Sequence, residues 1–138
     1  MRQQQKQGAR GEEQAAAALT RLGVEMVVKV ETPVRLVRGQ VIRHKKADAD
    51  ITGIYPATGQ RVLAEVKTHD DNTLPWSEFR PHQPVRLSEN VRCKGLSFVI
   101  WVHSAGVFVL TWPIPGFAPG ASIALDYAKR FNLLKEIY

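Results

Sequence analysis

Two apolar segments in the second half of the chain constrain the fold most strongly. Residues 97–102 and 107–112 consist almost entirely of Phe, Val, Ile, Leu and Trp, and a short turn at 104–106 joins them. A strand with one solvent-facing side alternates apolar and polar residues, whereas strands this uniformly apolar are buried on both sides. We therefore expect a pair of strands inside a sheet that helices cover on both faces.

The other periodic segments complete the prediction of an α/β fold. In chain order, the expected elements are a helix at 9–22, a strand at 24–30, a two-stranded basic ribbon at about 33–46, strands at 49–55 and 60–67, a helix from 82 or 83 to 93, the two apolar strands, and a helix at 122–134 with Ser122 as a candidate cap. This order predicts a single α/β domain in which helices flank a mixed central β-sheet. The domain is expected to span 8–138, and the Gln-rich residues 1–7 are expected to form a disordered tail.

Positive charge is unevenly distributed along the chain. The net charge is +6, and no acidic residue lies between Glu31 and Asp48. A second basic cluster, which includes Arg92 and Lys94, follows residue 79. We expect contacts with DNA phosphates from Arg35, Arg38, Arg43, Lys45 and Lys46 in the ribbon and from Arg80 and Arg86 beyond it. The alternatives are a generically basic protein and a plain hairpin whose polar face is rich in arginine.

The composition disfavours several classes of protein. No apolar run approaches the length of a membrane span, and residues 1–7 lack the apolar stretch of a signal peptide. The single cysteine, Cys93, cannot form an internal disulfide, which favours a reducing cytoplasm. The His and Cys residues show no zinc-ligand spacing. We therefore expect a cytoplasmic protein without membrane contact or structural zinc.

Asp50 and the segment Glu65-Val66-Lys67 form the most informative local pattern. Strand alternation places Glu65 and Lys67 on one face, with the apolar residues of the strand directed to the core. Asp50 begins the neighbouring strand of a hairpin, so two carboxylates and an amine can form one site for Mg²⁺, or for Mn²⁺ as the alternative. Asp48 is a rival to Asp50. In the other interpretation, Glu65 and Lys67 form only a surface ion pair on a solvated strand.

Taken together, these residues resemble the PD-(D/E)XK nucleases, in which an Asp precedes a hairpin and a Glu-x-Lys lies on the next strand. A more specific resemblance is to the RecU-type Holliday junction resolvases. It is carried by residues 50–55, Glu65-Val66-Lys67-Thr68, Leu74-Pro75, His82-Gln83 and Leu87. The first helix is also similar to that of the archaeal Hjc resolvases, through Gly8, Glu12, Leu19 and Gly23. The resemblance covers about residues 8–112.

This resemblance implies a restriction-endonuclease-like fold and a magnesium site. The implied roles are metal binding by Asp50, Glu65 and the Val66 carbonyl, positioning of the attacking water by Lys67, completion of the acidic pocket by Glu12, and ordering of the water or phosphate by Gln83. Glu13 is an alternative to Glu12, but the spacing from Gly8 matches Glu12 better.

The resemblance also implies an activity, the Mg²⁺-dependent hydrolysis of phosphodiester bonds that resolves four-way DNA junctions. Symmetric cleavage of a junction needs two sites, so a C2 homodimer is expected. RecU-type enzymes carry a long stalk before the catalytic Asp, and residues 33–46 are shorter, which bears on junction specificity more than on cleavage. Two alternatives stay open: a nuclease of the same fold that acts on other DNA, of restriction or repair type, and a non-catalytic basic DNA-binding module.

Overall fold

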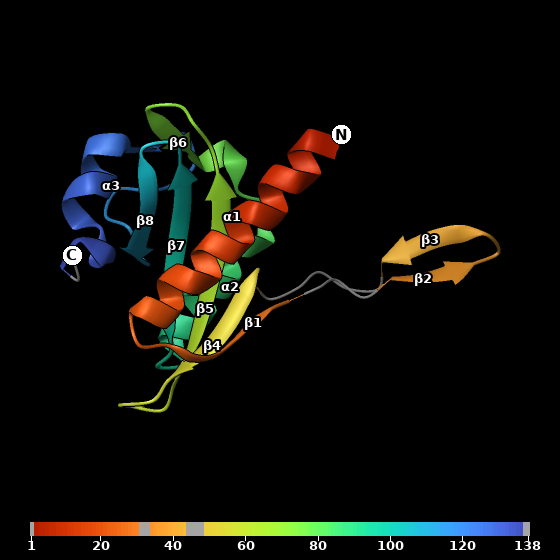
Figure 1. Ribbon diagram of the computed structural model, residues 1–138, viewed down its shortest axis with the longest axis horizontal. Helices are drawn as coiled ribbons and strands as arrows, with labels where there is room; N and C mark the ends of the chain where they lie inside the picture. The colour runs from red at the N-terminus through yellow and green to blue at the C-terminus, as the bar shows by residue number, and fades with distance from the viewer. Residues whose placement is uncertain (1, 31–33, 44–48, 137–138) are drawn as a thin grey trace.

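A five-stranded mixed sheet forms the centre of the molecule (Figure 1). The computed structural model describes the backbone of residues 2–30, 34–43 and 49–136. In spatial order the strands are β1 (Glu25–Lys29), β4 (Ile51–Tyr55), β5 (Gln60–Thr68), β7 (Leu96–His103) and β8 (Gly106–Thr111). β5 and β7 run parallel, and the other neighbours are antiparallel. A helical connection between β5 and β7 makes this parallel pair possible.

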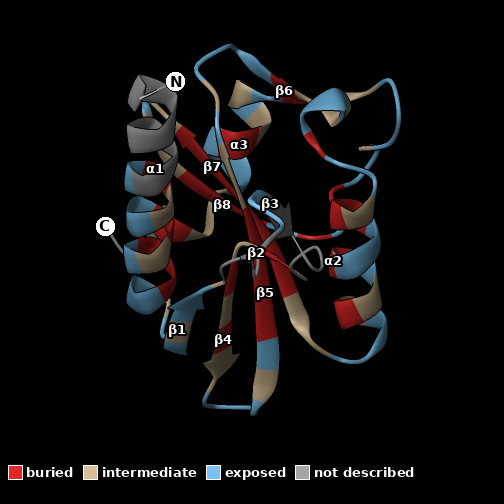
Figure 2. Cartoon of the chain, turned by 90° about the vertical axis from the view of Figure 1, so that its right-hand side faces the viewer, coloured by how far each residue is buried: buried red, intermediate tan, exposed pale blue. Residues whose placement is uncertain are grey.

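Helices cover both faces of the sheet (Figure 2). They are α1 (Arg2–Arg21) and α2 (His82–Arg92). Leu19 of α1 joins Ala64 of β5 in one buried cluster, and Leu87 of α2 joins Leu63 of β5 in the other. Successive β5 residues thus face opposite helices, and each fully buried leucine contributes roughly 1.5–3 kcal/mol through burial. The predicted α/β domain with a mixed, helix-flanked sheet is confirmed.

The predicted burial of the two apolar segments is also confirmed. Residues 97–102 of β7 are all buried, and so are residues 108–110 of β8. β7 lies between β5 and β8 in the sheet, and its largest side chain, Trp101, is completely buried. A strand in this position meets apolar neighbours on both sides, which explains why its sequence does not alternate.

α1 begins earlier than expected, at Arg2 instead of residue 9. It therefore includes residues 2–7, which were expected to form a disordered tail. Gln, Lys and Arg are good helix formers, and a helix that is already nucleated by packed residues extends at little cost. Although α1 has 20 residues, no helix within the described part of the chain is long and apolar enough to cross a membrane.

The C-terminal region differs from the predicted single helix. It consists of β9 (Ser122–Ala124), α3 (Leu125–Phe131) and a 3-10 helix, η2 (Leu133–Glu136). β9 pairs antiparallel with β6 (Thr73–Pro75), which lies in a segment for which no strand was predicted. Ala124, and not Ser122, occupies the position that caps α3. The expectation of a helix from residue 122 was wrong because the first three residues form strand hydrogen bonds with a distant segment.

The basic ribbon forms a separate two-stranded sheet. β2 (Val34–Val37) and β3 (Gln40–Arg43) pair antiparallel around Arg38 and Gly39. Both turn residues have positive φ, 52° and 78°, as a tight two-residue hairpin turn requires. In Figure 1 the ribbon projects away from the five-stranded sheet. The predicted hairpin is confirmed at 34–43, while the ends of the predicted ribbon lie outside the described residues.

Candidate functional site

β4 and β5 bring the carboxylates of Asp50 and Glu65 together at one end of the sheet. The strand register pairs Ile51 with Ala64, so Asp50, which immediately precedes β4, lies beside Glu65. The backbone N–H of Val66 donates a hydrogen bond of 2.9 Å to Oδ2 of Asp50. The sheet itself therefore holds the first carboxylate next to the second.

Glu65 is the most deeply buried charged residue of the described chain, with 1 % of its surface exposed. It shares a face of β5 with Leu63 and lies on the side of α2. Burial raises the pKa of Glu65 to about 9, and the negative charge of Asp50 and a hydrogen bond with it add to this effect, while Lys67 opposes it. Its Oε2 has no hydrogen-bond partner among the described residues. A buried carboxyl in this state calls for a proton or a cation.

Lys67 places an ammonium group on the same face of β5. Its Nζ donates a hydrogen bond of 2.8 Å to Oε1 of Gln83 and lies 4.8 Å from the centre of the Phe79 ring. Burial lowers the pKa of Lys67, and the charges of Glu65 and Asp50 oppose that shift. The amine is therefore partly desolvated and fixed in position beside two carboxylates.

Gln83 is the residue of α2 that reaches the site. Its Oε1 accepts hydrogen bonds from Nζ of Lys67 and from the backbone N–H of Arg80, the second at 2.9 Å. The side chain is buried. The resemblance implied that Gln83 orders the water or the phosphate. In the structure its oxygen holds Lys67, so its direct effect is on the position of the amine.

The acidic residues of α1 are not brought into one metal-binding group with Asp50 and Glu65. Glu12 is half-buried and Glu13 is exposed. The neighbouring Gly11 is buried, and a side chain there would collide with Oγ1 of Thr68 at the end of β5. Within the described ranges, no group of three or more His, Cys, Asp or Glu residues is suited to hold a metal ion. The roles assigned to Glu12 and to the Val66 carbonyl stay predictions, and Asp48 lies outside the described residues.

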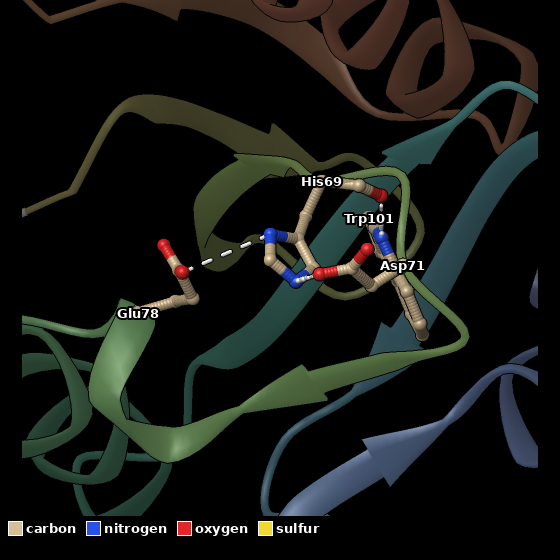
Figure 3. Close-up of polar contacts among 4 residues, drawn as sticks. All are labelled: His69, Asp71, Glu78 and Trp101. Atoms are coloured by element: carbon tan, nitrogen blue, oxygen red, sulfur yellow. Dashed lines mark hydrogen bonds and ion pairs between the residues drawn. The ribbon is translucent and has the colours of Figure 1, made fainter.

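A second polar cluster, which no local sequence pattern indicated, surrounds His69, the residue that follows β5 (Figure 3). Nδ1 of His69 lies 3.7 Å from Oε1 of Glu78, and Nε2 lies 3.4 Å from Oδ2 of Asp71. The backbone oxygen of His69 accepts a hydrogen bond of 2.7 Å from the indole N–H of Trp101. The negative charge of Glu78 also raises the pKa of Lys67, against the dominant effect of burial. Glu78 follows β6, and its proximity to Lys67 depends on tertiary folding that no local sequence pattern indicates.

The residues predicted to bind DNA are only partly described. Arg80, which precedes α2, and Arg86 of α2 are exposed, and Arg38 is exposed at the turn of the ribbon. Only the backbone is described at residues 35 and 43. Lys45 and Lys46 lie outside the described residues. The three described arginines are therefore accessible to a polyanion.

No protein-family model matches the chain, and no curated protein sequence matches it significantly. Asp50, Glu65, Lys67 and Gln83 are the predicted site residues that the structure brings together.

Proposed function

We propose that the chain is a Mg²⁺-dependent endonuclease of the PD-(D/E)XK type that resolves four-way DNA junctions. One observation carries the proposal: the carboxylate pair of Asp50 and Glu65, with one member almost fully buried, has a fixed amine beside it. Two ionised carboxylates at this position are unfavourable unless a cation binds or Glu65 keeps a proton. An arrangement that serves stability alone would not place the pair there.

The donor set fits Mg²⁺ better than it fits a structural zinc ion. Asp50 and Glu65 offer carboxylate oxygens, and Oε2 of Glu65 has no other partner among the described residues. Mg²⁺ takes one or two carboxylates and keeps several waters, so a set of three acidic ligands is not required. When bound, the ion would activate a water molecule and reduce the negative charge on the attacked phosphate. Asp50, Glu65 and the Val66 carbonyl would hold it.

Lys67 would act on the reacting atoms together with the metal site. Its ammonium is fixed by Gln83 and lies on the face of β5 that carries Glu65. A preorganised positive charge in a partly desolvated site stabilises the developing charge on a phosphate more than it would in water. In the proposed hydrolysis a bond forms between the water oxygen and phosphorus, and one phosphate ester bond breaks. The products are a phosphate end and a hydroxyl end.

Branched DNA is the proposed substrate, and the protein is proposed to act as a homodimer. A net charge of +6 and the exposed Arg38, Arg80 and Arg86 support a polyanionic partner. A projecting basic ribbon can contact phosphates outside the strand that is cut. Two copies related by a twofold axis would present two sites to opposite strands of a junction.

The test is cleavage of a labelled, immobile four-way junction and of linear duplex with the same sequence, each with Mg²⁺ and with EDTA. We expect paired, symmetric nicks in the junction alone, which disappear with EDTA. Asp50→Asn should abolish cutting and leave junction binding intact. Equal cutting of both substrates would support the nuclease activity but contradict the specificity for junctions. Tight binding without cleavage in any divalent metal would contradict the enzymatic proposal and favour a DNA-binding module.

A further inference from the structure

A cavity of about 450 Å³ lies at the far end of α2 from the candidate site. The turn between β4 and β5 lines it on one side, and the last turn of α2 and the residues that follow line it on the other. Its cationic lining residues are Arg61, Arg86 and Lys94, and an acidic one is Glu89. The cavity therefore has an excess of positive charge that suits an anion.

The cavity and the candidate site lie along the same two elements. α2 runs antiparallel to β5, because Gln83 meets Lys67 while Asn90 donates a 3.3 Å hydrogen bond to the backbone oxygen of Arg61. Alternate residues of β5 share a face, so Arg61 lies on the same side as Glu65 and Lys67. From Gln83 to the residues after α2 the distance is about 16 Å at 1.5 Å per helical residue.

Hydrogen bonds hold the wall of the cavity in a fixed shape. Asn90 is buried, and its side-chain amide donates a 2.8 Å hydrogen bond to the backbone oxygen of Leu96. Gly95 packs directly against the Asn90 side chain, where there is no room for a Cβ. The backbone oxygen of Lys94 accepts a 2.7 Å hydrogen bond from the side chain of Gln60. The cation at position 94 is therefore carried by an ordered segment.

Lys94 adopts a backbone conformation that normally favours glycine. Its φ is 74°, and it directly follows Cys93, the C-cap of α2. Helices commonly place Gly at this position because other residues are strained there. A lysine near a helix C-terminus also gains from the helix dipole. A purely structural role and a binding role predict different results for Lys94→Gly, since glycine relieves the strain and removes the charge.

We propose that this cavity binds a second backbone phosphate of the DNA, about 16 Å from the phosphate that is cut. Lys94 supplies the positive charge that the test below removes, and Arg61 also lines the cavity. Arg86 is paired with Glu89 at 3.1 Å, so the Glu89 charge is offset within the cavity. The identity of the ligand rests on the proposed function, which makes DNA the partner.

The experiment measures junction binding by fluorescence anisotropy over a range of salt concentrations, in protein that carries Asp50→Asn and cannot cut. Lys94→Gly should lower the affinity about eightfold at 0.1 M salt and reduce the slope of log K against log salt by about 0.9, the effect of one lost phosphate contact. The Tm should not fall. Lys94→Asn, which also tolerates positive φ, should give the same loss. Arg92→Ala is the matched control, because Arg92 is exposed on α2 and is not among the residues that line the cavity.

If Lys94→Gly and Arg92→Ala lowered the junction affinity and the salt slope equally, Lys94 would contribute only general surface charge. This result would overturn the proposal. Unchanged affinity in Lys94→Gly, or an Asp50→Asn protein that binds no DNA, would overturn it as well. A different result would contradict the proposed nuclease activity. If the unmodified chain cuts no junction while Lys94→Gly still weakens binding, the phosphate site stands and the enzymatic proposal does not.

Discussion

Nζ of Lys67 lies 2.8 Å from Oε1 of Gln83, and the same oxygen accepts the backbone N–H of Arg80. The Arg80 hydrogen bond fixes Gln83, and Gln83 in turn fixes the amine. Lys67 lies on β5 and Gln83 lies in the first turn of α2, so the position of the amine depends on how the helix packs against the sheet. Any effect of Gln83 on cleavage is therefore expected to act through Lys67.

Gln83→Ala should lower the rate of junction cleavage about tenfold to a hundredfold, the usual range for residues that orient a catalytic group. Junction affinity should change little, because the charges that contact DNA remain. Single-turnover cleavage over a range of pH tests whether Gln83 acts through Lys67. Without Gln83, the part of the pH–rate profile that reflects ionisation of Lys67 should shift. Gln14→Ala on α1, an exposed glutamine, is the control. A rate loss with an unchanged pH profile would argue that Gln83 does not act through Lys67.

Glu65 should make the metal-free protein less stable as the pH rises. The pKa of Glu65 is about 9 in the folded chain, above its ordinary value of 4.5. Between these values the folded state keeps a proton that the unfolded state has lost, so the free energy of unfolding falls with pH, by at most about 1.4 kcal/mol per unit. Urea unfolding in EDTA from pH 5 to pH 8.5 measures this slope. Glu65→Gln cannot ionise and should flatten it; identical slopes in the two proteins would contradict the buried, protonated carboxyl.

Gly11 should tolerate no side chain while Thr68 keeps its hydroxyl group. A Cβ at position 11 would collide with Oγ1 of Thr68, so Gly11→Ala should destabilise the protein by about 1–3 kcal/mol even though alanine favours a helix. Thr68→Ala removes the colliding atom and should restore most of the loss in the double variant. Thermal unfolding of both single variants and the double variant completes the cycle. Simple additivity would show that α1 does not contact β5 at this point.

The ribbon should contribute binding energy without taking part in chemistry. Replacing Arg35, Arg38 and Arg43 with glutamine should weaken junction binding and lower its salt slope by up to about 2.7, if each arginine contacts one phosphate. The control removes the same charge from α1 and α3, through Arg21, Lys129 and Arg130. Salt titrations of binding compare the two triple variants. Equal slopes would show that the ribbon does not contact DNA.

The elements that burial dictates could be predicted from the sequence, and those that depend on distant partners could not. The segment at 97–102 is apolar because helices cover it on both sides, so its pattern alone revealed a central strand. β6 and β9 have three residues each and exist only because they pair with each other. A helical pattern from Ser122 could not indicate that the chain first forms a strand.

The same distinction applies to the candidate site. Asp50 and Glu65 could be related in advance, because a hairpin fixes which residues lie side by side. The contact between Lys67 and Gln83 joins a strand to a helix, and its geometry depends on packing that strand alternation does not describe. The burial of Glu65 could not be predicted either. Its face of β5 carries polar residues in the sequence, but α2 covers that face in the structure.

The central claim is that Asp50 and Glu65 bind a divalent cation in exchange for the proton of Glu65. Titration calorimetry with Mg²⁺ and with Mn²⁺ at pH 7.5, in two buffers with different ionisation enthalpies, measures the affinity and the number of protons released. We predict release of about one proton per ion, because the ionised carboxylate is the form that binds metal. Glu65→Gln and Asp50→Asn should each abolish this binding. Absence of binding by the unmodified chain, or binding that releases no proton and survives both substitutions, would contradict the account.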